Sequence, residues 1–253
     1  MSWRDTAGAQ DGVLTRAQLR QHGTADTIIS RMVLDGRLSS VVRGVFLVGG
    51  APMTYRARLW TGVLATDGML GFATAAGLWG VLDAGEFSVH VVLPHDRRVY
   101  PPSWVRVHRV PVAPYAVTST SGLPATSRSW TVLDCLPTLS RNERSRLADR
   151  AVQRGWIDRS DLLRRLREFP GRTGNTALRE LSAAMSDGAA AESERMLHRL
   201  LRQAGLRDWK PNFPVWTGGE LVGVVDVAFP AKKIAIEVDG WAYHSDVDRF
   251  RRV

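Results

Sequence analysis

The sequence has a single cysteine, Cys135, among its 253 residues. One thiol excludes a disulfide framework and any zinc site that needs several cysteine ligands. Long apolar runs are also missing. The least charged stretch, Val63–Leu82, carries Asp67 and four glycines, which favours a buried core segment over a membrane span. The first residues, MSWRDTAGAQDG, lack the apolar segment of a secretory signal, so we expect a cytoplasmic protein.

Lysine is scarce as well, because only three of the 34 basic residues are lysines. The net charge is nevertheless +9 and the pI about 10.6. A protein this basic is typical of those that bind a polyanion, and nucleic acid is the usual one. Codon bias also produces an excess of arginine, so composition alone leaves both explanations open. The length predicts about two domains, and three small ones also fit.

The residues from 11 to 50 predict a helix-turn-helix. Thr15 and Gln18 have the spacing of a capping box, and Gly23 would end that first helix. Thr24 is expected to cap a second helix, which Gly36 would end. Its apolar residues occupy one face, and its other side chains point away from them; the two sets are Ile28, Ile29, Met32 and Val33, against Thr27, Ser30, Arg31 and Leu34.

A short hairpin should follow, with strands Leu38–Val42 and Val45–Val48 around an Arg43-Gly44 turn. In a winged helix-turn-helix the second helix enters the major groove and the wing lies near phosphates. The residues predicted to contact DNA are therefore Thr27, Ser30 and Arg31 at base edges and Arg37 and Arg43 at phosphates. The alternative is a small helical cap with a solvated polar face.

Residues 51–175 predict an α+β domain without a catalytic motif. Helices are expected at 55–65, 74–82, 128–136, 142–154 and 159–169, and strands at 87–93 and 105–110. The histidines His90, His95 and His108 lack the spacing of helical metal ligands and fit better as strand or loop residues. The Gly- and Ser-containing stretch Gly171–Gly188 is the expected linker.

Residues 190–253 predict an amphipathic helix ended by Gly205, followed by strands at 212–217, 220–229 and 234–239. A turn at Gly218-Gly219 joins the first two strands, and a four-residue loop, Pro230–Lys233, joins the last two. With that loop, Asp226 lies opposite Glu237.

Three carboxylates should then share one face, since alternate residues of a strand face the same way: Asp226, Glu237 and Asp239. Like charges in apolar strands repel each other unless a cation lies between them, and oxygen donors suit Mg²⁺ or Mn²⁺. Such a site is suited to phosphodiester hydrolysis. The alternative is a solvated sheet edge with arginine partners.

Two further residues are candidates at this site. His244 lies five residues after Asp239 and could exchange a proton near neutral pH, although a surface histidine is equally compatible with the sequence. Glu194 lies at the edge of the apolar stripe of its helix, from which it could reach the sheet. It could equally be a solvated residue that favours the helix dipole.

The stretch VVDVAFPAKKIAIEVDGWAYH, Val224–His244, resembles the restriction-endonuclease-like superfamily with the PD-(D/E)xK motif, and most of all its Vsr-like branch. This resemblance implies Mg²⁺-dependent cleavage of DNA. It makes Asp226, Glu237 and the carbonyl of Val238 metal ligands, and it matches His244 and Glu194 to catalytic positions of that branch. Asp239 stands where the wider superfamily has lysine. That fold continues with a helix and a strand, so we expect an incomplete core, whose exposed edge favours a homodimer.

The stretch Gly12–Gly50 resembles the winged-helix domain of AbiEi-type antitoxins, which are DNA-binding autorepressors of toxin–antitoxin operons. GFATAAGLWGVL (Gly71–Leu82) and GLPATSRSWTVLDCL (Gly122–Leu136) resemble the segment that follows this domain. The whole chain is thus similar to fusions of such a domain with a Vsr-like one. The expected parts are a winged helix-turn-helix at 1–50, an α+β domain at 51–175 and a nuclease domain at 190–253.

Two functions follow from these observations. The first is a double-stranded DNA endonuclease that uses Mg²⁺ or Mn²⁺. The second is a non-catalytic repressor of the antitoxin type, with a cognate toxin as partner. A hydrolase acting on another substrate has only the carboxylates in its favour.

Overall fold

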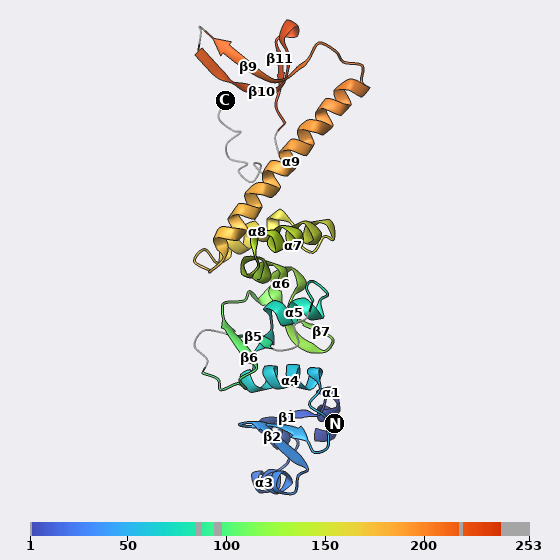
Figure 1. The fold of residues 1–253 in the computed structure, drawn as a ribbon, viewed down its shortest axis with the longest axis vertical. Coiled ribbons are helices and arrows are strands. Elements are labelled where there is room, and N and C mark those ends of the chain that lie inside the picture. The colour runs from blue at the N-terminus through green and yellow to red at the C-terminus, as the bar shows by residue number, and fades with distance from the viewer. Residues whose placement is uncertain (1, 84–87, 94–97, 218–219, 239–253) are drawn as a thin grey trace. The chain divides into compact units, whose positions relative to one another are not determined.

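The computed structural model describes residues 2–83, 88–93, 98–217 and 220–238, which form an α+β fold (Figure 1). The chain divides into two compact units, Met1–Leu178 and Arg179–Val253. The helices of the first unit are α1 Trp3–Ala9, α2 Arg16–Gln21, α3 Asp26–Leu34, α4 Tyr55–Thr66, α5 Phe72–Leu78, α6 Arg128–Cys135, α7 Arg141–Gln153 and α8 Arg159–Glu168. Helix α9, Asn175–Gln203, begins there and continues into the second unit.

The first unit holds two sheets. One consists of β1 Val13–Thr15, β2 Leu38–Val42 and β3 Val45–Val48, in the order β1-β3-β2. The other has the order β6-β5-β4-β8-β7, and its strands are β4 Met69–Leu70, β5 Val89–Leu93, β6 Val105–Arg109, β7 Val117–Thr120 and β8 Leu123–Thr126. Short 3₁₀ turns lie at Pro114–Ala116 and Leu136–Thr138.

The two helices and the hairpin predicted within residues 11–50 are present. Thr15 and Gln18 form the expected capping box of α2, and the hairpin β2–β3 has the predicted bounds. The prediction that Thr24 caps the second helix is wrong, because Ala25 occupies the N-cap and offers no side-chain bond. Asp26 in the first turn supplies the negative charge that favours a helix N-terminus. Neither α1 nor β1 is evident from periodicity, since both are very short.

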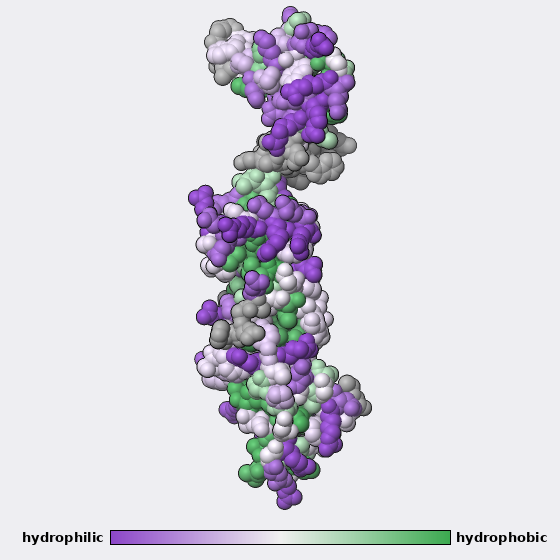
Figure 2. All heavy atoms as spheres, turned by 45° about the vertical axis from the view of Figure 1, so that its right-hand side comes forward, coloured by the Kyte–Doolittle hydropathy of each residue, from purple (hydrophilic) through white to green (hydrophobic). Residues whose placement is uncertain are grey.

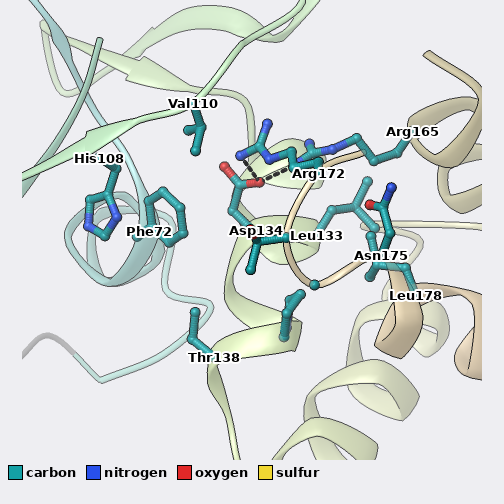
Figure 3. Close-up of a pocket in the computed structure, with 13 residues that line it drawn as sticks. Phe72, His108, Val110, Leu133, Asp134, Thr138, Arg165, Arg172, Asn175 and Leu178 are labelled. Atoms are coloured by element: carbon teal, nitrogen blue, oxygen red, sulfur yellow. Dashed lines mark hydrogen bonds and ion pairs between the residues drawn. The ribbon is translucent and has the colours of Figure 1, made fainter. Parts of the chain in front are cut away.

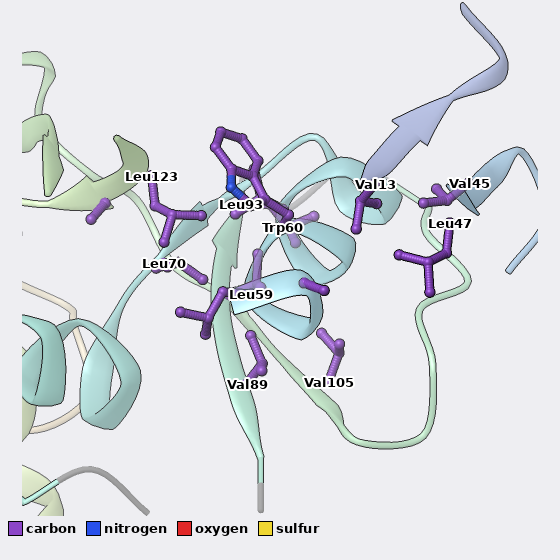
Figure 4. Close-up of a cluster of buried hydrophobic side chains, with 14 residues drawn as sticks. Val13, Val45, Leu47, Leu59, Trp60, Leu70, Val89, Leu93, Val105 and Leu123 are labelled. Carbon is purple, nitrogen blue, oxygen red and sulfur yellow. The ribbon is translucent and has the colours of Figure 1, made fainter. Parts of the chain in front are cut away.

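Two clusters of buried side chains hold this part together. One lies among α1, α2, α3 and the small sheet, and contains Leu14, Leu19, Ile29, Met32 and Phe46. The other joins the opposite side of that sheet to α4 and the larger sheet (Figure 4). Val13, Val45 and Leu47 pack there with Trp60, so residues 1–50 share a core with the residues that follow. Gly62 lets α4 approach β5 closely, because a Cβ there would lie 3.0 Å from Val89.

The stretch Val63–Leu82 is divided among α4, β4 and α5, and Leu70, Ala75 and Ala76 are buried in it, as predicted. The boundary between the two units, after Leu178, lies within the predicted linker Gly171–Gly188, but the stretch is helical from Asn175 onward because α9 runs through it. Alanine, leucine, methionine and glutamate favour a helix there, and they outweigh the cost of about 1 kcal/mol that a glycine adds.

The second unit contains the C-terminal part of α9 and one sheet. Its strands are β9 Lys210–Thr217, β10 Glu220–Phe229 and β11 Ile234–Ile236, in the order β11-β10-β9, with a 3₁₀ turn at Pro230–Lys232. Leu201 of α9 packs on Val227 and Phe229, with Leu197 and Ile236 beside them. One face of the sheet is therefore covered by the helix.

Among the described helices, none has the length and apolar character that a membrane crossing requires. Cys135 is buried and free, as expected for a lone thiol. Hydrophilic side chains gather on the visible face around α7 and α8 (Figure 2), where many exposed residues are charged.

Candidate functional site

The two strands β10 and β11 have the register that the loop length predicts. Val227 pairs with Ile236, Ala228 with Ala235 and Phe229 with Ile234. Continued by one residue, this register sets Glu237 opposite Asp226. Because Val227 faces α9, Asp226 belongs to the other face of the sheet. The pairing on which the carboxylate site depends is confirmed up to Ile236, where the ladder ends.

A side chain continues the contact between the two strands beyond that point. The main-chain N–H of Val238 donates a hydrogen bond of 2.7 Å to Oδ2 of Asp226. The carboxylate thus holds the main chain after β11 beside β10. Asp226 is half-buried, whereas Glu237 is exposed. Two of the predicted metal ligands, Asp226 and the Val238 main chain, are therefore in direct contact, and Glu237 is the residue that precedes Val238.

A polar contact also reaches the sheet from α9. Asn212 of β9 lies between the pairs Val225–Phe213 and Val227–Pro211, and so stands opposite Asp226. Its Nδ2 donates to Oε1 of Glu194 at 3.4 Å. Glu194 therefore reaches the sheet at the level of Asp226, as its place on the helix predicts, but it touches Asn212 rather than Asp226.

Sequence reasoning missed both Asn212 and His198. His198 Nε2 lies 4.0 Å from Glu194 Oε1, and its ring lies 4.8 Å from that of Trp209. The signal for His198 was its place one helical turn after Glu194. The turn at Gly218-Gly219 alone would set Pro211 opposite Asp226, and the register shift between Leu221 and Gly223, which the sequence does not reveal, brings Asn212 there instead. Asn212 also has a φ of +45°, a conformation that asparagine tolerates better than most residues.

The donors at this site are carboxylate and carbonyl oxygens, which fit Mg²⁺ or Mn²⁺ by their chemistry. Within the part of the chain that the structure describes, no three histidine, cysteine, aspartate or glutamate side chains gather into a metal site. Asp239 and His244, the other predicted site residues, lie outside the described residues. The described donors alone would hold a cation through two side chains and one carbonyl.

The second predicted site is the exposed side of α3. Thr27, Ser30 and Arg31 are all exposed there, whereas Ile29 and Met32 are buried. The apolar face is narrower than predicted, because Ile28 is 50% exposed, whereas Leu34 is 86% exposed, as its predicted place on the opposite face requires. In Figure 2, hydrophobic and hydrophilic atoms reach the surface together at the lower end, where α3 lies in Figure 1. This surface offers hydroxyls, a cation and an exposed leucine to a partner.

The cations near α3 divide into two groups. The predicted phosphate contacts are both exposed: Arg37 directly precedes β2, and Arg43 directly follows it. Arg16 and Arg20 instead bind Asp26, at 3.0 Å and 2.5 Å, and connect α2 to the start of α3. The hydrogen bonds from Arg20 and Arg16 hold the pKa of the Asp26 carboxyl below its ordinary value. Arg16 and Arg20 therefore connect α3 to α2, and Arg31, Arg37 and Arg43 are exposed cations outside this ion-pair cluster.

No family model matches this chain. Two curated relatives from Mycobacterium tuberculosis are each 29% identical over 175 residues, "Uncharacterized protein MT2308" of strain CDC 1551 / Oshkosh and "Uncharacterized protein Rv2248" of strain ATCC 25618 / H37Rv. The match covers 68% of this chain and 62% of each relative. The chain thus spans less than two thirds of the length of these relatives.

Among solved structures, the chain is similar to the Rv2827c protein of Mycobacterium tuberculosis. The identity is 19%, and the match covers 72% of this chain and 80% of that one. The TM-score is 0.36, which is too low to carry an argument about the fold.

Proposed function

We propose that this chain binds double-stranded DNA and hydrolyses its phosphodiester bonds at a divalent-cation site on β10 and β11. The observation that carries the proposal is the β10–β11 register, together with the 2.7 Å bond from Val238 to Asp226. It brings oxygen donors from two neighbouring segments together on the face of the sheet that α9 leaves uncovered. The proposed architecture of this unit is a restriction-endonuclease-like α-β-β-β core.

The residues of the chain would act as follows. Asp226, Glu237 and the Val238 carbonyl hold a Mg²⁺ or Mn²⁺ ion, which lowers the pKa of a bound water and stabilises charge on the phosphate. Through its hydrogen bond, Asn212 would hold Glu194 of α9 at the β9 edge of the sheet. Asp239 and His244 are proposed as further catalytic residues from the sequence alone.

DNA binding is assigned to residues 1–50, as a winged helix-turn-helix. The order α2, α3, β2, β3, with β1 completing the small sheet, supports this assignment. Exposed Thr27, Ser30 and Arg31 on α3 would face base edges, and Arg37 and Arg43 would face phosphates.

The test is nicking of supercoiled plasmid by the full chain with Mg²⁺ or Mn²⁺. We expect activity in the unsubstituted protein and a loss of at least about a hundredfold in Asp226→Asn, because a neutral amide replaces a charged ligand. Asp208→Asn is the matched control, since Asp208 is exposed and has a φ of +67°, which asparagine tolerates. Equal nicking by the Asp226→Asn protein, or none by the unsubstituted one, would contradict the proposal.

A second candidate is an AbiEi-like repressor without catalysis, with a cognate toxin as partner. The observation in its favour is that Oδ2 of Asp226 is already bonded to a main-chain N–H, and that no third carboxylate joins it among the described residues. A repressor would take up no Mn²⁺, and Asp226→Asn would leave its affinity for DNA unchanged.

A further inference from the structure

A buried cluster of three charged side chains lies in the first unit, far along the chain from the proposed nuclease site. Oδ1 of Asp134, on α6, accepts hydrogen bonds from Nη2 of Arg165 and from Nη2 of Arg172, the latter at 2.7 Å. The three side chains are almost fully buried, with exposed fractions of 0% for Asp134, 3% for Arg165 and 6% for Arg172. Two cations therefore share one carboxylate oxygen.

The charge of this cluster is not balanced. Arg165 stacks over Trp130 at 3.9 Å, yet its Nε and Nη1 have no hydrogen-bond partner among the described residues. Burial lowers the pKa of Arg172 to about 10, although Asp134 opposes that change. Burying an unpaired charge in a protein costs several kcal/mol, so a net charge of +1 is an unusual feature for a core.

A cavity of about 280 Å³ borders the cluster. Figure 3 shows Phe72 and His108 on one side of it and Asp134 with Arg172 on the other. The rest of the wall is mostly apolar, with Val110, Leu133, Pro137 and Leu178. The volume approaches the ~300 Å³ at which small-molecule pockets begin. The cavity thus combines an apolar interior with an excess of positive charge.

Two further observations agree with a ligand site. Oδ2 of Asp134 and Oδ1 of Asn175 have no donor among the residues that the structure describes, so they could accept from a hydroxyl. Phe72 has a φ of +48°, which is unfavourable for a bulky residue. Strained backbone of this kind occurs preferentially where a ligand is held. His108 adds no charge at neutral pH, because burial lowers its pKa to about 4.

We propose that this cavity binds a small hydroxylated aromatic carboxylate. The carboxylate of the ligand would neutralise the excess charge of Arg165 and Arg172, its ring would lie between Phe72 and the apolar wall, and its hydroxyl would donate to a free acceptor. The site is separate from the nuclease and DNA-contacting residues, and it goes beyond the proposed function.

The experiment is calorimetric titration of the full chain with 4-hydroxybenzoate, with 4-hydroxybenzyl alcohol as the uncharged analogue. We expect saturable binding of the acid and at least about tenfold weaker binding of the alcohol, because a charged hydrogen bond is lost. The substitution Arg172→Gln should weaken the binding of 4-hydroxybenzoate by a similar factor. This variant keeps the Arg165–Asp134 pair, so the cluster becomes neutral rather than unpaired. Arg167→Gln, an exposed arginine on the same helix as Arg165, is the control and should bind normally.

Val110→Phe tests the cavity without changing any charge, since Val110 is only partly buried and its larger replacement would fill the space. The Val110→Phe protein should also fail to bind 4-hydroxybenzoate. If the Arg172→Gln protein does not fold, this second variant tests whether the cavity is the binding site. No saturable binding of the acid up to about 10 mM, a range well beyond a useful small-ligand affinity, would overturn the proposal. Equal binding by the Val110→Phe protein, or equal weakening by Arg167→Gln, would overturn it as well.

Discussion

Nε2 of His108 lies 3.1 Å from Nδ1 of His90, on the neighbouring parallel strands β6 and β5. One ring must donate and the other accept, so this contact requires at least one neutral imidazole. Burial and nearby Arg106 lower the pKa of His90, and burial followed by His90 lowers that of His108 to about 4.

The pair predicts a pH-dependent stability. Between about pH 6.5 and pH 4 the unfolded chain binds protons at these histidines and the folded chain does not, so the free energy of unfolding falls as the pH is lowered through that range. Urea unfolding of the first unit at pH 7, 5.5 and 4.5 measures the slope. The double variant His90→Gln, His108→Gln should flatten this dependence of the unfolding free energy on pH relative to the unsubstituted protein. Equal slopes in the two proteins would contradict the prediction.

Gly174 has a φ of +91°, and a Cβ there would lie 2.5 Å from Cβ of Pro137. Gly174→Ala combines backbone strain with a clash against a rigid ring, so we expect a loss of about 2 kcal/mol or more in stability. Chemical denaturation measures it. Gly171→Ala is the control, because a Cβ at Gly171 meets nothing within 4 Å, and its stability should stay within about 0.5 kcal/mol. A neutral Gly174→Ala variant would show that the turn before α9 is not constrained.

Arg31→Ala should weaken DNA binding and reduce the slope of log K against log salt by about one if Arg31 contacts a phosphate, because one fewer counterion is released. If Arg31 contacts a base instead, the substitution should lower the affinity only for DNA sequences that carry that base. Binding isotherms at several salt concentrations separate these outcomes. Arg146→Ala, an exposed arginine on α7, should leave binding unchanged. Identical isotherms for Arg31→Ala and the unsubstituted protein would remove α3 from the interface.

The bond from Val238 to Asp226 also predicts a difference between two substitutions. Asp226→Asn retains an oxygen acceptor and should change stability by less than about 0.5 kcal/mol, whereas Asp226→Ala leaves the N–H unpaired and should cost about 1 kcal/mol. Denaturant unfolding of the second unit compares them. Mn²⁺ affinity should fall at least about tenfold in both, since both lose the charge. If both variants keep the affinity, Asp226 is not a ligand.

The features that could be predicted from the sequence depend on interactions between residues that are close in the chain. Thr15 and Gln18 cap α2 because their spacing is that of a capping box, and the Pro230–Lys233 loop sets the β10–β11 register because loop length determines which residues pair. Both signals involve residues close in the chain. The predicted linker Gly171–Gly188 contains the boundary between the units, but its helical conformation was missed, because isolated glycines and serines are tolerated in a helix whose other residues favour it.

The sequence by itself determined the α+β class, the order of the helix-turn-helix elements and the hairpin that sets Glu237 against Asp226, since each depends on periodicity or a short turn. Tertiary structure alone decided the Asn212–Glu194 contact, the His90–His108 pair and the cluster of Asp134 with Arg165 and Arg172. Their partners stand between 18 and 38 residues apart, and only the packing of separate elements brings such residues into contact.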